Sequence, residues 1–196
     1  METAEQKQNL REEAAAILRQ IPEKDRSAQS RTLMKMLTDS DLYVNSRSIL
    51  VYVSTPEEPD TRELIKKALR DQKKVYVPKI LGERMEFFRL QELSELKSGA
   101  MGIQEPVGNP AAVFPYSLHD SLESAQQCLV IIPGLAFDHS LGRLGRGKGY
   151  YDRFLSGFHK CMKIGYAFTG QILPEIPCTE QDVKMDLILT AEEVIH

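Results

Sequence analysis

The chain has 196 residues, which is enough for one α/β domain and too few for two comfortable ones. We therefore expect a single domain over residues 1–196. With 42% hydrophobic and 27% charged residues, the composition is that of an ordinary soluble protein, and the net charge of -3 argues against general nucleic-acid binding.

The sequence shows no clear pattern for membrane insertion, secretion or disulfide formation. No apolar run approaches the length that spans a membrane, and the first residues are acidic and lack a signal-peptide pattern. The cysteines Cys128, Cys161 and Cys178 are odd in number and widely separated. This spacing gives neither a zinc site nor a disulfide framework, and it predicts a cytoplasmic protein.

The first two predicted elements are helices over residues 3–20 and 23–37, separated by Pro22. Lys7 and Arg11 are an i,i+4 pair on the first helix, so both side chains lie on one face. Like charges at this spacing cost a few tenths of a kcal/mol unless an anion lies between them. The pair therefore indicates either a solvated face or an anion site.

A β-rich apolar segment over residues 48–53 predicts a central strand. A loop over 54–60 follows, and then a helix over 60–72 that we expect Asp60 to cap. This order puts the loop at the carboxyl edge of the sheet, where α/β proteins bind ligands. Glu57 and Glu58 are therefore candidate functional acids, or else solvated loop charges.

The middle of the chain is less regular. Short strands are predicted over 74–78 and 85–89, the second at an edge of the sheet. Residues 92–102 look irregular and lead into a turn-rich loop over 102–106 on the ligand side. Residues 107–126 have the composition of a surface excursion without a domain boundary.

The most informative stretch is 142–152, Gly-Arg-Leu-Gly-Arg-Gly-Lys-Gly-Tyr-Tyr-Asp, with four glycines and three cations. A buried strand is predicted upstream over 128–132, and residues 150–158 downstream have helical spacing. A loop that leads from a strand into a helix offers unpaired amides and a favourable dipole to an anion. The stretch therefore predicts a phosphate-binding loop, with a basic surface turn as the alternative.

This loop is not one of the standard phosphate motifs. Gly142-x4-Gly147-Lys148 matches the first part of a P-loop, but Gly149 stands where a Ser or Thr would hold magnesium. The GxGxxG spacing of dinucleotide folds is also absent. Asp152 could supply the magnesium ligand instead.

The last predicted strands cover 162–168 and 187–190, and Asp182 and Asp186 precede the final strand. These two acids are either surface charges or part of a metal site. The alternation of strands and helices along the chain predicts a three-layer α/β/α fold with a largely parallel sheet. A mixed edge is expected at 85–89.

Two segments closely resemble the signature of the 5-formyltetrahydrofolate cyclo-ligase family, also called 5,10-methenyltetrahydrofolate synthetases. They are Pro-Gly-Leu-Ala-Phe-Asp at 133–138 and Gly-Arg-Leu-Gly-Arg-Gly-Lys-Gly-Tyr-Tyr-Asp-Arg at 142–153. The resemblance implies ATP-dependent ring closure of 5-formyltetrahydrofolate to 5,10-methenyltetrahydrofolate, releasing ADP and phosphate. We expect small-molecule substrates, no nucleic-acid or membrane partner, and a monomer or weak homo-oligomer.

The resemblance also implies roles for individual residues. Catalysis would involve Lys148, Arg146 and Tyr150. Folate would contact Val53, Glu58, Met101, Arg146 and Tyr150, with Met101 where homologues can carry an aromatic residue. Mg²⁺ would bind Asp152 and Asp186, with Asp182 as the alternative to Asp186. The expected ATP-binding residues are Lys7, Arg11, Arg143, Leu144, Gly145, Arg146, Gly147, Lys148, Gly149, Tyr150 and Tyr151.

Three other functions compete with this one. A phosphate-binding or nucleotide-sensing module would keep the glycines and cations but would not need Glu58 or the acids of a metal site. A sugar-phosphate isomerase or acyl-transfer enzyme would need a general base near the loop, and only Glu57 or Glu58 is available. A nucleic-acid binder would need aromatic side chains interleaved with its basic residues.

Overall fold

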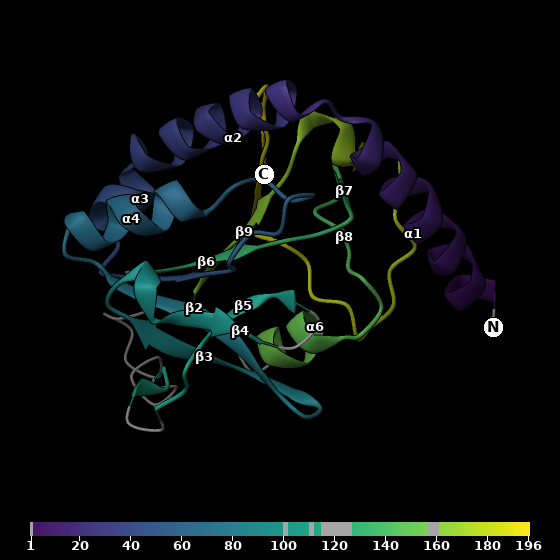
Figure 1. Cartoon of the computed structure of the whole chain (residues 1–196). Coiled ribbons are helices and arrows are strands. Elements are labelled where there is room, and N and C mark those ends of the chain that lie inside the picture. Colours follow the sequence, from purple (N-terminus) through teal and green to yellow (C-terminus); the bar gives the residue numbers. More distant parts are fainter. Residues whose placement is uncertain (1, 100–101, 110–111, 115–126, 157–160) are drawn as a thin grey trace.

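The central element is a seven-stranded sheet with the order β12-β11-β9-β6-β1-β2-β3 (Figure 1). The computed structural model describes residues 2–99, 102–109, 112–114, 127–156 and 161–196. Only the edge pairs β2–β3 and β11–β12 are antiparallel, so the predicted largely parallel sheet with a mixed edge is confirmed. The strands are β1 (Ser48–Val51), β2 (Lys74–Leu81), β3 (Arg84–Leu90), β6 (Cys128–Ile132), β9 (Met162–Tyr166), β11 (Leu187–Leu189) and β12 (Val194–Ile195).

Helices cover both faces of this sheet, as Figure 1 shows. On one face lie α2 (Glu23–Thr38), α3 (Asp41–Asn45) and α4 (Arg62–Arg70), and on the other lies the short α6 (Tyr150–Leu155). Strand β1 shows why both faces are apolar. Its Ile49 and Val51 pack toward α2 and α4, whereas Leu50 packs in the cluster that contains α6.

The strand order reverses between β1 and β6, and this point determines where a ligand can bind. From β1 the chain passes through α4 to β2, and from β6 it passes through α6 to β9, in the opposite direction along the sheet. Because α4 and α6 lie on opposite faces, the loops that follow β1 and β6 separate. Such a crevice at the carboxyl ends of the strands is the usual ligand site of an open α/β sheet.

Two smaller sheets flank the central one. Strands β7 (Ala136–Asp138), β8 (Arg143–Leu144) and β10 (Ile172–Leu173) form one, and β4 (Leu96–Ser98) and β5 (Gln104–Pro106) form the other. Short 3-10 turns, η1 (Leu93–Glu95) and η5 (Thr169–Gln171), precede β4 and β10. Helix α1 (Glu2–Gln20) packs Ala14 and Leu18 against the first small sheet, beside β7 and β8 in Figure 1.

Some predicted boundaries were wrong. Thr61, not Asp60, is the N-cap of α4, and the Thr61 hydroxyl donates to the buried Tyr52 carbonyl (2.6 Å). Asp60 instead accepts hydrogen bonds from the Ser54 hydroxyl and the Arg62 N–H. Helix α6 ends at Leu155, and residues 157–160 and much of 107–126 lie outside the described residues. Within the described parts of the chain, no helix is long and apolar enough to span a membrane.

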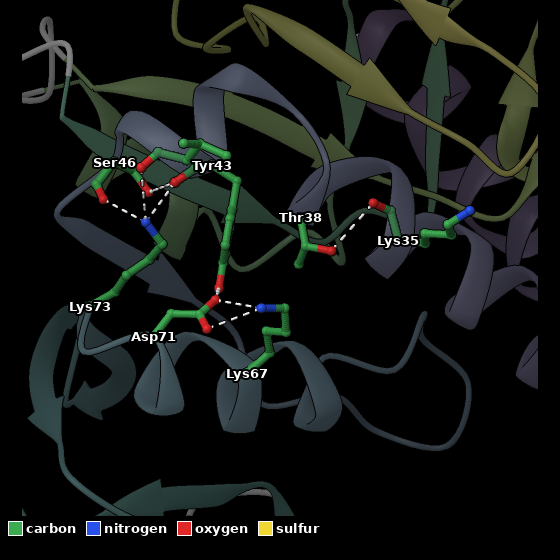
Figure 2. A network of polar contacts seen from close by, with 8 residues as sticks. Lys35, Thr38, Tyr43, Ser46, Lys67, Asp71 and Lys73 are labelled. Carbon is green, nitrogen blue, oxygen red and sulfur yellow. Dashed lines mark hydrogen bonds and ion pairs between the residues drawn. The ribbon is translucent and has the colours of Figure 1, made fainter.

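A polar network far from the crevice ties α3 to α4 and β2 (Figure 2). The Tyr43 hydroxyl donates to Asp71 Oδ2 (2.6 Å), which also accepts from Lys67, and Lys73 donates to the carbonyls of Tyr43 and Ser46. Burial and the hydrogen bond to Asp71 raise the pKa of Tyr43, so this phenol stays protonated. None of these residues lines the large cavity described below, so the network is structural.

We expect Tyr43→Phe to lower the free energy of unfolding by about 1 kcal/mol, the net contribution of one hydrogen bond. Turnover at saturating substrate should not change, because the network does not touch the cavity. Chemical denaturation measures the first effect and steady-state kinetics the second. A loss of turnover in this well-folded variant would contradict a purely structural role.

Candidate active site

A cavity of about 830 Å³ lies at the crevice between the ends of β1 and β6. Two groups of residues form its walls. The polar wall comes from α1, from the glycine-rich loop and α6, and from the segment before β11. The apolar wall comes from the ends of β1, β2 and β3 and from β5 and its preceding turn. The lining residues are Lys7, Arg11, Tyr52, Val53, Glu58, Pro78, Ile80, Met85, Ile103, Glu105, Pro133, Gly134, the run 143–153, Ser156, Thr179, Gln181 and Asp182.

The buried carboxylate of Asp138 fixes the start of the glycine-rich loop. Its Oδ1 accepts the backbone N–H groups of Ser140 (2.9 Å) and Gly142 (2.8 Å), and its Oδ2 accepts that of Ile176 (2.8 Å). A side chain at Gly142 would lie only 2.8 Å from this carboxylate, so glycine is needed there. Asp138 does not line the cavity, and its role is to hold the β7–β8 turn in shape.

Arg143 and Asp152 bind each other at the base of the loop. Arg143 Nη2 donates to Asp152 Oδ1 at 2.8 Å, with only 4% of the Arg143 side chain exposed, and its guanidinium lies over the Tyr151 ring. The predicted phosphate ligand and the predicted metal ligand are therefore already paired. This ion pair connects β8 to α6 and leaves Asp152 Oδ2 without a donor from the described residues.

The N-terminal helix brings its two cations to the same cavity. Arg11 Nε donates to the Gly145 carbonyl (3.0 Å), and Lys7 Nζ binds Asp182 Oδ2 (2.5 Å). Gly147 has a φ of +87°, and a Cβ there would lie 3.4 Å from the Arg11 guanidinium. The like-charged pair therefore faces the cavity and is not a solvated surface.

Arg146 and Lys148 are the exposed cations of the loop. Arg146 Nη2 lies 3.5 Å from Glu58 Oε1 and 3.8 Å from Glu57 Oε2. In the part of the chain that the structure describes, Lys148 forms no hydrogen bond or ion pair. Both side chains can therefore move toward a ligand at little cost.

Tyr150 and Tyr151 both line the cavity, together with Leu144, Gly145 and Gly149 of the loop. The Tyr150 hydroxyl donates to the Gly82 carbonyl at the tip of the β2–β3 hairpin (3.2 Å). Burial and the nearby Glu58 carboxylate raise the pKa of Tyr151. Tyr151 therefore stays a neutral phenol at the bottom of the site, and Tyr150 links α6 to the opposite wall.

Two of the expected folate residues, Val53 and Glu58, lie on the other side of the cavity. Val53 is buried at the end of β1, and Glu58 Oε2 accepts the Thr55 N–H at 2.9 Å. Met101 lies outside the described residues. Pro78, Ile80 and Met85 also line this wall, although nothing in their local sequence indicated a site.

The two candidate acids near the C-terminus are placed differently. Asp182 lines the cavity, where its Oδ2 accepts from Lys7 and from the backbone and hydroxyl of Thr179. Burial opposes ionisation, but these hydrogen bonds outweigh it and lower the pKa of Asp182. Asp186 does not line the cavity, and both of its oxygens accept from Lys163. The structure thus brings Asp182, not Asp186, to the other site residues.

The described residues contain no group of three His, Cys, Asp or Glu side chains arranged to hold a metal ion. This does not conflict with magnesium, which usually binds proteins through one or two carboxylates and keeps water and phosphate as its other ligands. A site of this kind would need a bound polyphosphate to complete it.

The fold and the cavity define an α/β protein whose site has one basic, glycine-rich wall and one apolar wall. The sequence profile described as the 5-formyltetrahydrofolate cyclo-ligase family matches residues 3–191. The chain therefore belongs to this family, and the resemblance inferred from residues 133–138 and 142–153 is confirmed.

Individual relatives are similar in sequence over most of the chain. A probable 5-formyltetrahydrofolate cyclo-ligase of Schizosaccharomyces pombe is 33% identical over 86% of this chain and 87% of its own length. The 5-formyltetrahydrofolate cyclo-ligase of Mus musculus is 31% identical over 93% of this chain and 92% of its own. The NMR structure of Aquifex aeolicus 5,10-methenyltetrahydrofolate synthetase superposes with a TM-score of 0.81 at 28% identity, covering 96% of this chain and 91% of that one.

Proposed function

We infer that the chain catalyses the reaction of its family, the ATP-dependent conversion of 5-formyltetrahydrofolate to 5,10-methenyltetrahydrofolate with release of ADP and phosphate. One observation carries this inference. The same cavity has a cation-rich glycine loop on one wall and an apolar wall with carboxylates on the other. Triphosphate and a flat pterin can therefore bind side by side, and a phosphate-binding module without chemistry would not need the second wall.

The chemistry requires this proximity. The formyl oxygen attacks the γ-phosphorus and ADP leaves, which gives an N5-iminium phosphate. N10 then attacks the formyl carbon and loses its proton, and phosphate leaves as the five-membered ring closes. Phosphoryl transfer of this kind depends on positioning and on neutralising charge, not on a protein nucleophile.

We propose that different cations of the cavity position the triphosphate and neutralise its charge. Lys148 and Arg146 are exposed and can follow the charge on the transferred phosphoryl group. Lys7 and Arg11 hold the triphosphate from the side of α1, where Lys7 retains two N–H donors beyond its bond to Asp182. Arg143 contributes charge from below, while its bond to Asp152 keeps the loop in place.

We further propose that Mg²⁺ binds with ATP between Asp152 and Asp182. Each carboxylate has one oxygen that accepts no hydrogen bond from the described residues, namely Asp152 Oδ2 and Asp182 Oδ1. Two free carboxylate oxygens fit an ion that takes its remaining ligands from phosphate and water. When bound, Mg²⁺ would neutralise charge on the phosphate oxygens. Asp186 has no such free oxygen and is replaced by Asp182 in this proposal.

The free cysteines also support a reducing compartment. Cys128 and Cys161 are buried, Cys178 is exposed, and none of the three forms a disulfide. We therefore propose the cytoplasm as the place where this enzyme acts.

The two-wall arrangement can be tested at Glu58. Glu58→Gln should weaken binding of 5-formyltetrahydrofolate about tenfold, because the carboxylate is replaced by a neutral amide of the same shape. Its ATP affinity should stay nearly unchanged. Isothermal titration with each ligand separates the two effects.

Glu57→Gln provides a matched control, since Glu57 is next in sequence but does not line the cavity. It should bind both ligands like the unmodified chain. An equal loss of folate and ATP affinity in Glu58→Gln would mean that Glu58 only shapes the loop.

A further inference from the structure

A second carboxylate, that of Glu105, lies in the apolar wall of the cavity. The residue is only 7% exposed, yet it lines the cavity. Among the residues that the structure describes, none donates a hydrogen bond to its carboxylate or forms an ion pair with it. Its oxygens are not fully buried but open into the cavity, so a ligand that fills the cavity removes their water and must offer hydrogen-bond donors in its place. The missing donor is therefore expected on the ligand.

The surrounding structure holds Glu105 in this place. Glu105 pairs with Lys97 in the β4–β5 ladder, and Lys79 of β2 donates to the carbonyls of Pro106 (2.7 Å) and Val107 (3.1 Å). A Cβ at Gly99 would lie 2.5 Å from Glu105 Cδ. The glycine therefore leaves the space that the Glu105 side chain occupies, and any other residue would displace it.

The neighbouring wall indicates which part of a ligand this carboxylate meets. Pro78 and Ile80 of β2, the strand to which Lys79 ties the Glu105 segment, provide an apolar surface for a flat ring. The cations lie on the other wall, and one of them, Arg146, already forms an ion pair with Glu58. In 5-formyltetrahydrofolate the N5 formyl group must face the γ-phosphate, so the pyrimidine edge of the pterin points away from the cations.

That edge carries the 2-amino group and the N3–H, two parallel donors that match the two oxygens of one carboxylate. On the basis of the proposed function, we propose that Glu105 is a specificity-determining residue that accepts hydrogen bonds from these two groups. It recognises the 2-amino-4-oxopyrimidine ring of the folate. Glu105 positions the substrate and takes no part in moving phosphate or protons.

Glu105→Gln tests this assignment, since the amide keeps the size of the side chain but exchanges one acceptor for a donor. The KM for 5-formyltetrahydrofolate should rise about tenfold, with kcat and the KM for ATP little changed. Glu86→Gln is the matched control, because Glu86 lies on β3 and does not line the cavity. A fall in kcat at unchanged KM would overturn the proposal by giving Glu105 a role at the reacting atoms.

A substrate analogue identifies the ligand group directly. Calorimetric titration of the unmodified chain with the 2-desamino-2-methyl analogue of 5-formyltetrahydrofolate should show about tenfold weaker binding than with the parent compound. Glu105→Gln should bind the analogue and the parent almost equally. If the unmodified chain and Glu105→Gln distinguished the analogue from the parent compound to the same extent, the contact between Glu105 and the 2-amino group would be refuted.

If Glu105→Gln does not fold, two other measurements test whether Glu105 binds the pyrimidine edge. The analogue must still bind the unmodified chain more weakly, and Gly99→Ala, which displaces the carboxylate, must raise the KM for folate. Unchanged analogue binding refutes the proposal without any variant. Turnover of the parent compound by the unmodified chain tests the proposed function separately.

Discussion

Lys148→Ala is expected to lower kcat/KM by roughly 10- to 150-fold, the effect of removing a hydrogen bond to a charged group worth about 1.5–3 kcal/mol. Lys148 lies between Gly147 and Gly149, which both have positive φ and let the backbone turn closely around an anion. Its side chain is exposed and has no partner in the described structure, so it can reach the transferred phosphoryl group. The larger losses apply if this contact strengthens in the transition state.

Steady-state kinetics beside a thermal melt measure this effect. The melting temperature should barely change, because an exposed loop lysine contributes little packing. Lys35→Ala, at an exposed lysine of α2, is the control and should retain full activity. Near-normal turnover in folded Lys148→Ala would show that Lys148 does not contact the reacting phosphate.

The Asp182→Asn variant is expected to need roughly 10- to 100-fold more Mg²⁺ for half-maximal turnover. This loss of metal affinity is comparable to the loss seen in other enzymes when the hydrogen-bond partners of metal ligands are mutated. Asp182 lines the same cavity as the Arg143–Asp152 pair, and its Oδ1 accepts no hydrogen bond from the described residues. An asparagine can still bind Thr179, so the local fold should persist.

Asp186→Asn is the matched control, because Asp186 lies four residues away and binds Lys163 outside the cavity. Magnesium titrations of both variants at fixed ATP separate the two acids. A normal magnesium requirement in Asp182→Asn combined with a raised one in Asp186→Asn would reverse the assignment.

Local sequence was sufficient to predict the main strands and to single out the glycine-rich loop that lines the cavity. The run Cys-Leu-Val-Ile-Ile at 128–132 is buried on both faces, and its continuous apolarity is the signal of a central parallel strand. The loop at 142–152 was recognisable because glycine and cation content are local properties. Short elements such as α3 and β12 were missed, since five and two residues show no useful periodicity.

The site depended on contacts that no local pattern contains. Lys7 meets Asp182 across 175 positions of sequence, so nothing near either residue distinguished Asp182 from Asp186. Both acids lie in the segment between β10 and β11, and they differ in the residues that they bind, not in their chemistry. Glu105 lay in a turn that was predicted to face the ligand, but its burial follows from the β4–β5 pairing and from the space at Gly99.

This chain closes the folate ring at the expense of ATP. The most direct test is to mix it with 5-formyltetrahydrofolate, ATP and Mg²⁺ and to follow the near-ultraviolet absorbance of 5,10-methenyltetrahydrofolate together with ADP. We expect both products to appear in equal amounts and turnover to stop when excess EDTA is added. Full turnover in EDTA would contradict the magnesium requirement, and no absorbance change from a folded protein that binds both substrates would contradict ring closure.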